Sequence, residues 1–482
     1  MKKIFSLMIC ALAVCGWMKA QTLNIEVGQV TYLFPAEQAG IMNYTDGSTL
    51  TVMDKVFALA EVGEMYVNET SVVDNTVSVV YNGGTATVFV AGNVAKYLII
   101  SVSGAHVNIA QSDDLAEEIT YSLSGSSADG EFYMSGSYKA TIELNGLSLT
   151  NTTPVTSGAA VHVQNGKRIK VKVMEGTSNM LEDAAAGEQK GALYVKGHPE
   201  FSGKGTLMVK GHVKHAIKSG EYMTLKDATL KVLSAAGDGL NCGQYFLMKS
   251  GVLDISGVTD DGIQCDIDDT DVGSTGETAD HEDEDSGNIY LAGGQITINT
   301  AGIAAKGVKS EGDLIVTGGV IAITTTGKGK WDEEDLKTKA AACLGSDAKV
   351  VIAGGTLTLT STGAGGKGIN CDAAFEMSGG EVTIVTKGAL YYHNGTTENT
   401  NYTGNTDNVN SDYYSSSKGV KADGAITISG GKISVATAGR NAEGIESKTS
   451  ILISDGEVTV NSYDDGINVG GDGSDLIISG GY

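Results

Sequence analysis

Proline is scarce in this sequence, at 3 residues in 482, whereas glycine is abundant at 66. Because a collagen triple helix needs glycine at every third position and much proline, that fold is excluded. Aromatic residues make up only 6%, yet hydrophobic residues reach 41%, enough for a substantial core and too many for a disordered chain. The glycine-, threonine- and valine-rich stretches favour short strands joined by tight turns.

Cysteine is too rare to hold the fold together. Two of the six cysteines fall in the N-terminal apolar segment, and the other four are Cys242, Cys265, Cys343 and Cys371. Four cysteines in so long a chain do not make a disulfide scaffold, and no CxxC pair supports a zinc ribbon. We expect Cys242, Cys265 and Cys371 to be small, buried, weakly polar residues.

Basic residues are outnumbered, with 33 Lys and Arg against 58 Asp and Glu, for a net charge of −25. A protein this negative repels nucleic acid and anionic lipid and attracts cations. We therefore expect no nucleic-acid partner. An anionic ligand would need a bridging metal ion or a local basic strip.

Long apolar runs are absent except at the N-terminus. A pair of lysines precedes a short apolar run, and Ala20 is a small residue before a plausible cleavage junction, so residues 1–20 are predicted to be a signal peptide. A lipoprotein cut before Cys15 is less favoured, because Val14 stands where that motif wants a small residue. We expect a secreted or cell-surface protein that does not span a membrane, of unknown oligomeric state.

A repeat of about 23 to 25 residues runs from the middle of the chain to its end. Each copy has a short phrase, such as DGLNC at 238–242, DGIQC at 261–265 or KGVKA at 418–422, and a strand that stops at Gly-Gly and restarts. Self-similarity at this period predicts a solenoid, and three short alternating strands per repeat predict an all-β parallel β-helix. The Leu/Asn frame of a leucine-rich repeat is absent, and a propeller blade would need about 40 residues.

The repeat also predicts the domain organisation. Residues 21–85 alternate like strands without showing the period, so we expect an N-terminal β cap or small β domain there. Residues 86–482 are expected to form the parallel β-helix. The chain stops in the middle of a repeat, and we therefore expect the sequence to be incomplete at its C-terminus.

In a parallel β-helix, equivalent residues stack about 4.8 Å apart, so columns of the repeat become ladders in space. The small residue that closes the short phrase is expected to point inward. The residue before it, which includes Asn241 and Asn370, is expected to face solvent. Amide side chains there would form a hydrogen-bonded ladder and a polar strip suited to sugar hydroxyls.

Acidic residues gather at one column of the repeat. Asp238 and Asp261 fall on adjacent repeats, with Asp260 alongside, and stacked carboxylates repel unless a proton or a cation lies between them. Twelve acids and no Lys or Arg follow between residues 260 and 285, including Asp266. Because Ca²⁺ prefers about six to eight hard oxygen ligands, we predict Ca²⁺ near Asp238, Asp260, Asp261 and Asp266. The alternative is a solvated acidic loop.

The few aromatic residues concentrate in two predicted insertions, 327–339 and 387–416. Both enter at the same corner of the repeat and leave two repeats apart, so we expect them to flank one groove. Exposed rings there would offer platforms for sugar rings. The alternative is that these rings pack within their own loops. The candidate sugar-binding aromatics are Trp331, Tyr391, Tyr392, Tyr413 and Tyr414.

The repeated phrases DDGIQCD, KGVKSEGDLIVTGG and KGVKADGAITISGG resemble those of secreted bacterial carbohydrate-binding-domain proteins, over roughly residues 140–482. The resemblance implies a right-handed parallel β-helix, similar in architecture to pectate lyases. It also implies binding of calcium and of plant-type polysaccharides.

We therefore expect an extracytoplasmic polysaccharide-binding protein stabilised by calcium, more a binder than an enzyme, with no catalytic residue assigned. The first alternative is a calcium-dependent pectate or polyuronate lyase, in which a lysine would take the C5 proton of a uronate. Lys218, Lys306 and Lys309 are available, but they stand in repeating columns, which indicates a structural role. The second alternative is a non-catalytic surface adhesin.

Overall fold

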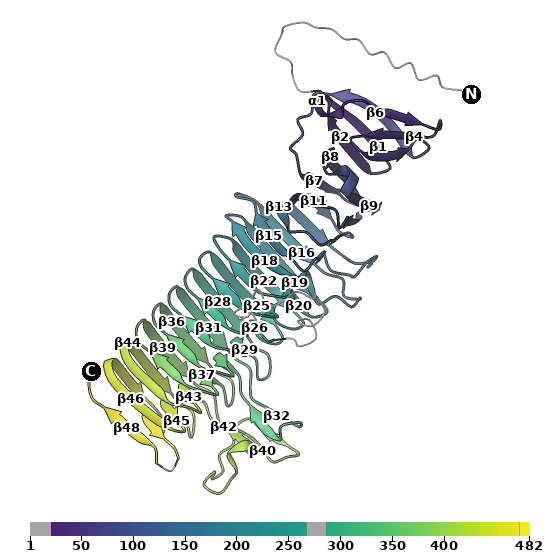
Figure 1. Cartoon of the computed structure of the whole chain (residues 1–482). Helices are drawn as coiled ribbons and strands as arrows, with labels where there is room; N and C mark the ends of the chain where they lie inside the picture. The colour runs from purple at the N-terminus through teal and green to yellow at the C-terminus, as the bar shows by residue number, and fades with distance from the viewer. Residues whose placement is uncertain (1–20, 268–285, 472) are drawn as a thin grey trace. The chain divides into compact units, whose positions relative to one another are not determined.

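The protein is described here by a computed structural model that covers residues 21–267, 286–471 and 473–482 (Figure 1). The predicted signal peptide and most of the acidic run after Asp266 lie outside these residues. The all-β prediction is confirmed, since the described chain is built of strands with one four-residue α-helix, α1 (Ala36–Ala39), and two three-residue 3-10 helices, η1 (Ala95–Tyr97) and η2 (Ser411–Tyr413). The chain forms two compact units, one reaching to Thr76 with Val88–Lys96, the other made of Val77–Thr87 and Tyr97–Tyr482.

The first unit consists of strands without the repeat, and three of them, β3 to β5, form a separate antiparallel sheet. Strand β1 pairs antiparallel with β2 and β6, and β2 pairs in parallel with β8. Phe57 packs edge-on against Tyr32 and Phe34, at ring-centroid distances of 5.1 and 6.0 Å, which builds a local core. The strands are β1 (Thr22–Val27), β2 (Val30–Pro35), β3 (Asn43–Thr45), β4 (Thr49–Val52), β5 (Lys55–Ala58), β6 (Val62–Asn68) and β8 (Thr85–Ala91).

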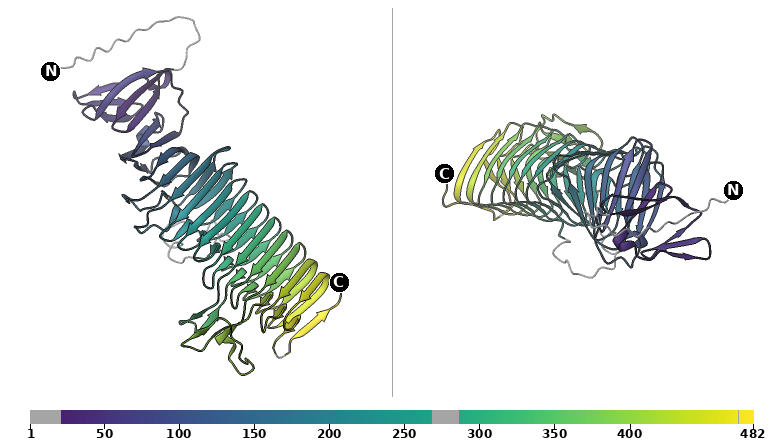
Figure 2. Two further views of the ribbon diagram at one scale, coloured as in Figure 1. Left: turned by 180° about the vertical axis from the view of Figure 1, so that it is seen from behind. Right: turned by 90° about the horizontal axis from the view of Figure 1, so that it is seen from above.

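The second unit begins with β7 (Thr76–Asn82), the antiparallel hairpin β9 (Leu98–Ser103) and β10 (His106–Gln111), and β11 (Ile119–Ser127). From there on, strands pair in parallel with their counterparts one repeat later, and Figures 1 and 2 show them as stacked arrows. Each repeat contributes three strands.

The strand that contains the short phrase occurs once in every repeat and joins a sheet of 14 strands. After the hairpin these strands are β12 (Glu131–Ser135), β14 (Val161–Gln164), β17 (Gly191–Val195), β20 (His215–Ser219), β23 (Leu240–Cys242), β26 (Ile263–Cys265), β29 (Lys306–Ser310), β34 (Ala342–Ser346), β37 (Lys367–Cys371), β43 (Val420–Ala422), β45 (Ile445–Ser447) and β47 (Ile467–Val469).

The two strands on either side of the Gly-Gly turn form the remaining ladders, and in three places they run together as one long strand. The strands before the turn are β15 (Arg168–Val173), β18 (His198–Gly203), β21 (Met223–Leu225), β24 (Phe246–Met248), β27 (Ile289–Leu291), β30 (Leu314–Val316), β35 (Val350–Ile352), β38 (Phe375–Met377) and β48 (Asp475–Ile478). The strands after it are β16 (Ser178–Glu182), β19 (Thr206–Gly211), β22 (Thr229–Ala235), β25 (Val252–Val258), β28 (Gln295–Thr300), β31 (Val320–Thr325), β36 (Thr356–Ser361) and β39 (Glu381–Thr386). The long strands are β13 (Ala140–Thr150), β44 (Ile426–Thr437) and β46 (Ser450–Asn461).

The core of the second unit is a set of aliphatic columns. One column is fully buried and in register from β20 to β45, and each member contacts the residue above and below it. It consists of Ile217, Leu240, Ile263, Val308, Leu344, Ile369, Val420 and Ile445. Burial of each such side chain stabilises the fold by about 1.5–3 kcal/mol relative to exposure.

The small residue that closes the short phrase points inward, as predicted. Cys242, Cys265 and Cys371 are buried and free, and Cys242 pairs in register with Cys265. The sequence pattern did not reveal one member of this column, Ser346, because its phrase, ACLGS, has Cys343 where most other copies have glycine.

Glycine has two separate reasons to recur. At Gly262 there is no room for a side chain, since a Cβ would lie 2.4 Å from the Gly307 carbonyl oxygen. At Gly294, the second glycine of a Gly-Gly turn, φ is +84°, in the left-handed region that glycine adopts without strain.

The two aromatic insertions fold into one lobe that projects from the side of the stacked strands (Figures 1 and 2). Thr338 Oγ1 of the first insertion donates to the Tyr414 carbonyl oxygen of the second at 3.0 Å, and Lys328 pairs with Glu398. The elements of the lobe are β32 (Lys330–Asp332), β33 (Lys337–Lys339), β40 (Tyr391–His393), β41 (Glu398–Asn399), η2 (Ser411–Tyr413) and β42 (Tyr414–Ser415).

Candidate functional site

Three aspartates form a cluster beside the 14-stranded sheet. Asp238 lies two residues before β23, and Asp261 lies two residues before β26 with Asp260 next to it. One carboxylate oxygen from each of the three lies within 4.8 Å of the others. Asp238 and Asp261 are buried, at 1% and 5% exposure, whereas Asp260 is exposed. The cluster is therefore held from inside the fold and open to solvent on one side.

The two buried aspartates each use one oxygen to hold the next repeat. The backbone N–H of Asp261 donates to Asp238 Oδ1 at 3.0 Å, and the N–H of Lys306 donates to Asp261 Oδ1 at 2.6 Å. The same position one repeat earlier is His215, whose Nδ1 accepts from the Asp238 N–H at 3.2 Å. This column therefore carries hydrogen-bond acceptors for a structural reason as well as any functional one.

The second oxygen of Asp238 belongs to a buried polar chain. Asn241 Nδ2 donates to Asp238 Oδ2 at 2.7 Å, and Lys218 Nζ donates to Asn241 Oδ1 at 2.6 Å. Asn241 is only 4% exposed, so the prediction that it faces solvent in an amide ladder is wrong. Its amide is used to orient Asp238 instead. Asn370, in the same column, is half-buried.

Oxygen atoms remain for a cation. Among the described residues, nothing donates a hydrogen bond to Asp261 Oδ2 or to either oxygen of Asp260. These atoms and Asp238 Oδ2 are hard carboxylate donors, which suit Ca²⁺ better than a softer metal. Three carboxylates provide fewer than the about six to eight oxygens that Ca²⁺ takes, so water or a bound ligand would complete the coordination.

The electrostatics of the cluster favour a proton or a cation. Burial, opposed by Lys306 and reinforced by Asp238 and Asp260, raises the pKa of Asp261 to about 7. Burial and the neighbouring Asp238 also raise the pKa of Asp260. Because Asp260 and Asp261 resist ionisation, binding of a cation would displace a proton from the cluster near neutral pH.

Asp266 stands apart from the three clustered aspartates. Its Oδ2 accepts from Gln264 Nε2 at 3.3 Å, and its buried Oδ1 accepts no hydrogen bond from the described residues. Burial and the nearby charge of Asp238 raise its pKa, against the effect of Lys218. The structure thus brings together three of the four predicted metal ligands, while residues 268–285 of the acidic run lie outside the described residues.

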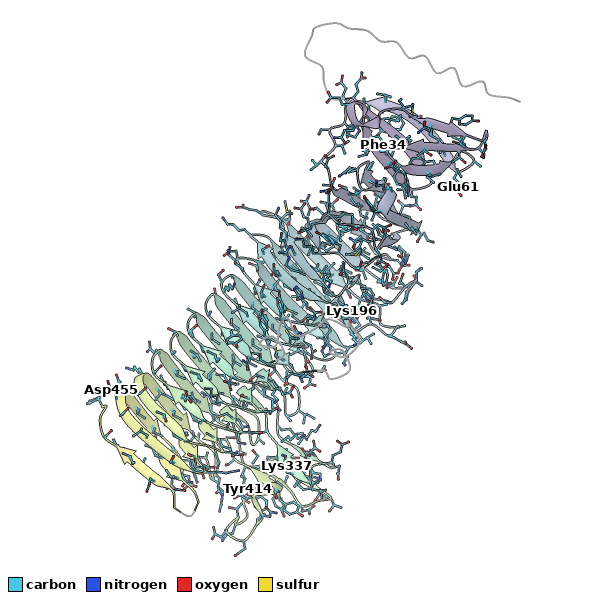
Figure 3. The ribbon with its side chains drawn as sticks, in the orientation of Figure 1. Phe34, Glu61, Lys196, Lys337, Tyr414 and Asp455 are labelled. Carbon is cyan, nitrogen blue, oxygen red and sulfur yellow. The ribbon has the colours of Figure 1, made fainter. Side chains whose placement is uncertain are left out.

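The aromatic residues of the lobe are mostly committed to each other. Trp331 is stacked between His393 and Tyr413, at centroid distances of 5.0 and 5.2 Å and interplanar angles of 11° and 4°. Figure 3 places Lys337 and Tyr414 on the lobe that carries this stack. Trp331 therefore makes its ring contacts within the lobe, and the predicted groove between two separate insertions is replaced by their direct packing.

The tyrosines of the second insertion differ in their surroundings. Tyr391 is 1% exposed, so its prediction as a sugar platform is wrong. Tyr392 stacks on Tyr402 at 4.3 Å, which leaves one face uncovered by that contact. Tyr413 stacks on Trp331, and Tyr414 is half-buried. The alternative interpretation, that these rings pack their own loops, fits the structure better.

Sequence analysis missed two runs of aromatic side chains on the outer side of earlier repeats. Tyr133, His162 and Tyr194 are in register on β12, β14 and β17, with successive centroids 4.8 Å apart. The second run comprises His198, Tyr222, Tyr245 and Tyr290. The signal was available, because Tyr133, His162 and Tyr194 occupy the column that continues into Lys218 and Asn241.

A family model described as "Carbohydrate-binding domain-containing protein" matches residues 103–389, which include the aspartate cluster. Since this match covers more than half of the chain, the protein belongs to the carbohydrate-binding domain-containing family. No curated protein matches the chain. Among the described residues, no helix is long and apolar enough to cross a membrane.

One solved structure is similar to part of the chain, that of the polysaccharide lyase-like protein from C. thermocellum in a gadolinium derivative. The identity is 18%, the TM-score is 0.39, and the match covers 65% of this chain and 99% of that one. A likeness at this level carries no conclusion about activity.

Proposed function

We propose that this protein is an extracytoplasmic glycan-binding module built on a right-handed parallel β-helix, with a calcium ion held by Asp238, Asp260 and Asp261. The membership of the carbohydrate-binding domain-containing family carries the proposal, because the matched residues include all three aspartates. Parallel pairing of each strand with its counterpart one repeat on supports the β-helix. Export rests on the N-terminal sequence alone.

The ion would have two effects. It would neutralise the repulsion among the three carboxylates and so stabilise the repeats that contain β23 and β26. Because Asp260 is exposed, it would also present a positive centre to an anionic group of the glycan, such as a uronate carboxylate. Uncharged glycans would instead depend on the outer aromatic side chains of the earlier repeats, such as Tyr133 and Tyr194.

The experiment is retention of the full chain on polygalacturonate and on a neutral β-glucan, each with Ca²⁺ and with chelator. The proposal expects retention on at least one glycan and no unsaturated product. Retention on polygalacturonate that disappears with chelator and in Asp260→Asn would support the metal as the point of contact. Failure to bind either glycan in both conditions would contradict the proposal for these two glycan classes and favour a surface adhesin.

A polyuronate lyase is the second candidate. The observation in its favour is that His215 and Lys306 both act electrostatically on Asp260, so basic groups lie near the proposed metal. An acidic C5 proton on a metal-bound uronate would need such a base. In the same experiment, ultraviolet absorbance that grows with time and is lost in Lys306→Ala would establish this activity in place of simple binding.

A further inference from the structure

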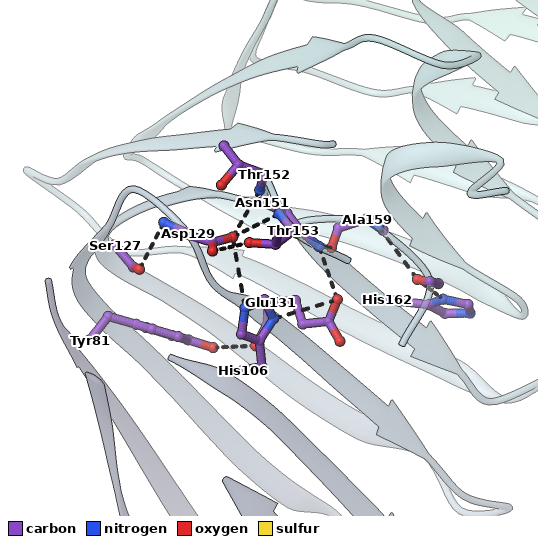
Figure 4. A network of polar contacts seen from close by, with 11 residues as sticks. Tyr81, His106, Ser127, Asp129, Glu131, Asn151, Thr152, Thr153, Ala159 and His162 are labelled. Carbon is purple, nitrogen blue, oxygen red and sulfur yellow. Dashed lines mark hydrogen bonds and ion pairs between the residues drawn. The ribbon is translucent and has the colours of Figure 1, made fainter. Parts of the chain in front are cut away.

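Ser157, His162 and Gln164 form a hydrogen-bonded chain outside the proposed calcium site. Ser157 Oγ lies 2.8 Å from His162 Nδ1, and His162 Nε2 lies 3.0 Å from Gln164 Oε1. Strand β14 buries Val161 and Val163, so the alternate residues His162 and Gln164 project together from its outer side. Ser157 comes from the loop that leads into this strand, and Figure 4 shows Ala159 of the same loop near His162.

The bonding partners define the tautomer of the imidazole. Oε1 of the Gln164 side-chain amide can only accept a hydrogen bond. Nε2 of His162 therefore carries the proton, and Nδ1 is left as an acceptor. The Ser157 hydroxyl therefore donates to Nδ1. This is the order of an activated nucleophile: a hydroxyl, a base within hydrogen-bond reach, and a third group that orients the base.

The surroundings keep the imidazole neutral and fixed. Burial lowers the pKa of His162, so the ring stays unprotonated at neutral pH and can accept a proton. Tyr133 and Tyr194 pack against it, each with a centroid distance of 4.8 Å and at interplanar angles of 66° and 63°. Ser157 itself is half-exposed next to the exposed residues 152–156, so a substrate can reach the hydroxyl from solvent.

The arrangement is not a general feature of the histidines in this fold. His198, His212 and His215 each lie next to a carboxylate, in pairs with Glu221, Glu182 and Asp238. His162 instead has a hydroxyl on one side and an amide on the other. A ring held between Ser157 and Gln164 can remove a proton from the serine hydroxyl. The other three histidines are paired with carboxylates, and those pairs contain no hydroxyl.

We propose that Ser157 is the nucleophile of an ester hydrolase, with His162 as general base and Gln164 as the residue that positions His162. Ser157 Oγ bonds to the ester carbonyl carbon while its proton passes to His162 Nδ1. The ester C–O bond then breaks, and the leaving alcohol takes that proton. Water attacks the acyl-serine by the same route, which releases the acid and restores Ser157.

A backbone donor also holds the serine side chain. The Ala159 N–H donates to Ser157 Oγ at 3.4 Å, which helps to fix the hydroxyl oxygen beside His162. The expected substrates are small acyl or methyl esters carried by a glycan. That substrate class rests on the proposed glycan binding, whereas the reactivity of Ser157 does not.

The test treats the full chain with a fluorophosphonate, which phosphonylates activated serines, and locates the adduct by mass spectrometry. We expect labelling of Ser157 and a labelling rate at least about 100-fold lower in His162→Ala and in His162→Gln, the usual contribution of a general base. Ser157→Ala should abolish the adduct. Ser137→Ala is the matched control, because Ser137 is exposed and donates to Asp113 rather than to a histidine.

Absence of an adduct at Ser157 in the wild-type chain would overturn the proposal, as would labelling that proceeds at the same rate without His162. Circular dichroism melting of each variant separates loss of reactivity from loss of fold, and His162→Gln keeps a polar side chain between the two tyrosines. Hydrolysis of a chromogenic acetate ester, lost in Ser157→Ala, would provide turnover. Neither readout requires glycan, so their failure is distinguishable from failure of glycan binding.

Discussion

Two acidic clusters stand at the same position of the repeat and are neutralised in different ways. In the first, Asp238, Asp260 and Asp261 approach one another and leave carboxylate oxygens without a donor. In the second, Lys418 Nζ lies 3.3 Å from Glu443 and also pairs with Glu446. In the sequence the two clusters look alike, because Asp261 and Glu443 each stand directly before a glycine.

The difference shows what the first cluster lacks. Burial and the neighbouring Glu446 raise the pKa of Glu443 to about 7 against the effect of Lys418. Burial is outweighed at Glu446, where Lys418 and the hydrogen bond with Glu443 lower the pKa. The second cluster therefore contains its own cation. The first has Lys306 as a more distant positive charge, so an external ion would have a larger effect there.

The largest effect is expected from removal of the internal cation. Lys418→Met should destabilise the protein by about 3–5 kcal/mol, because Glu443 and Glu446 would remain buried without their partner. Urea unfolding measures the change. Lys349→Met is the matched control, since Lys349 is 38% exposed and its two ion pairs are 3.8 and 3.9 Å long. That variant should lose less than about 1 kcal/mol, and equal losses in both would contradict the contrast.

Calcium should act on the first cluster only. At a free concentration of about 100 times its dissociation constant, Ca²⁺ should stabilise the wild-type chain by about 2.7 kcal/mol. Asp238→Asn combined with Asp261→Asn should abolish this gain, while Glu443→Gln should retain it. Thermal melting with Ca²⁺ and with chelator provides the measurement. If the Asp238/Asp261 double variant is stabilised by Ca²⁺ as much as the wild-type chain, these residues do not hold the ion.

The pH dependence of stability should separate the two clusters more finely. The pKa of Asp261 is about 7 in the folded chain against about 3.9 when unfolded. The folded state therefore binds this proton more tightly, and the free energy of unfolding should fall as pH rises from about 4 to about 7. Asp261→Asn should remove that part of the slope, and Glu443→Gln a further part. Calcium should suppress only the part of this slope that comes from Asp261. The same slope with calcium and with chelator in the wild-type chain would contradict this expectation.

The smallest effect on glycan binding is expected in the aromatic lobe. Trp331→Ala should leave glycan retention unchanged, because the indole already stacks on two rings of the lobe, His393 and Tyr413. It should loosen the lobe, since each stacked pair contributes about 0.5–1.5 kcal/mol. Hydrogen exchange of β32 and β40 would report that loosening. A loss of glycan retention without faster exchange would instead make Trp331 a binding residue.

Periodicity in the sequence was enough to predict the strands and the inward columns. Ile263 and Cys265 alternate with Gln264, and the structure buries the first two, because a strand sends successive side chains to opposite faces. The approach of Asp238 to Asp261 was predictable for the same reason. Ser346 was missed because Cys343 replaces the glycine that marks most of the other phrases.

The sequence pattern could not predict which side chains contact each other. Asn241 was expected in solvent, yet it lies between Lys218 and Asp238, because a neighbouring charge on each side offers better hydrogen bonds than a stacked amide. Trp331 and Tyr413, 82 residues apart in the sequence, could not be paired from it. Their contact depends on how two insertions fold against each other.

The amino-acid pattern alone is enough to specify an all-β chain with stacked columns, since the spacing of apolar residues and glycines dictates which positions can be buried in parallel strands. The pattern also specifies which columns carry acids. The folded chain is needed to show which acids share a lysine, which keep free oxygens, and where Ser157 meets His162. These outcomes depend on distances of a few ångströms between loops, and no local preference of the chain encodes those distances.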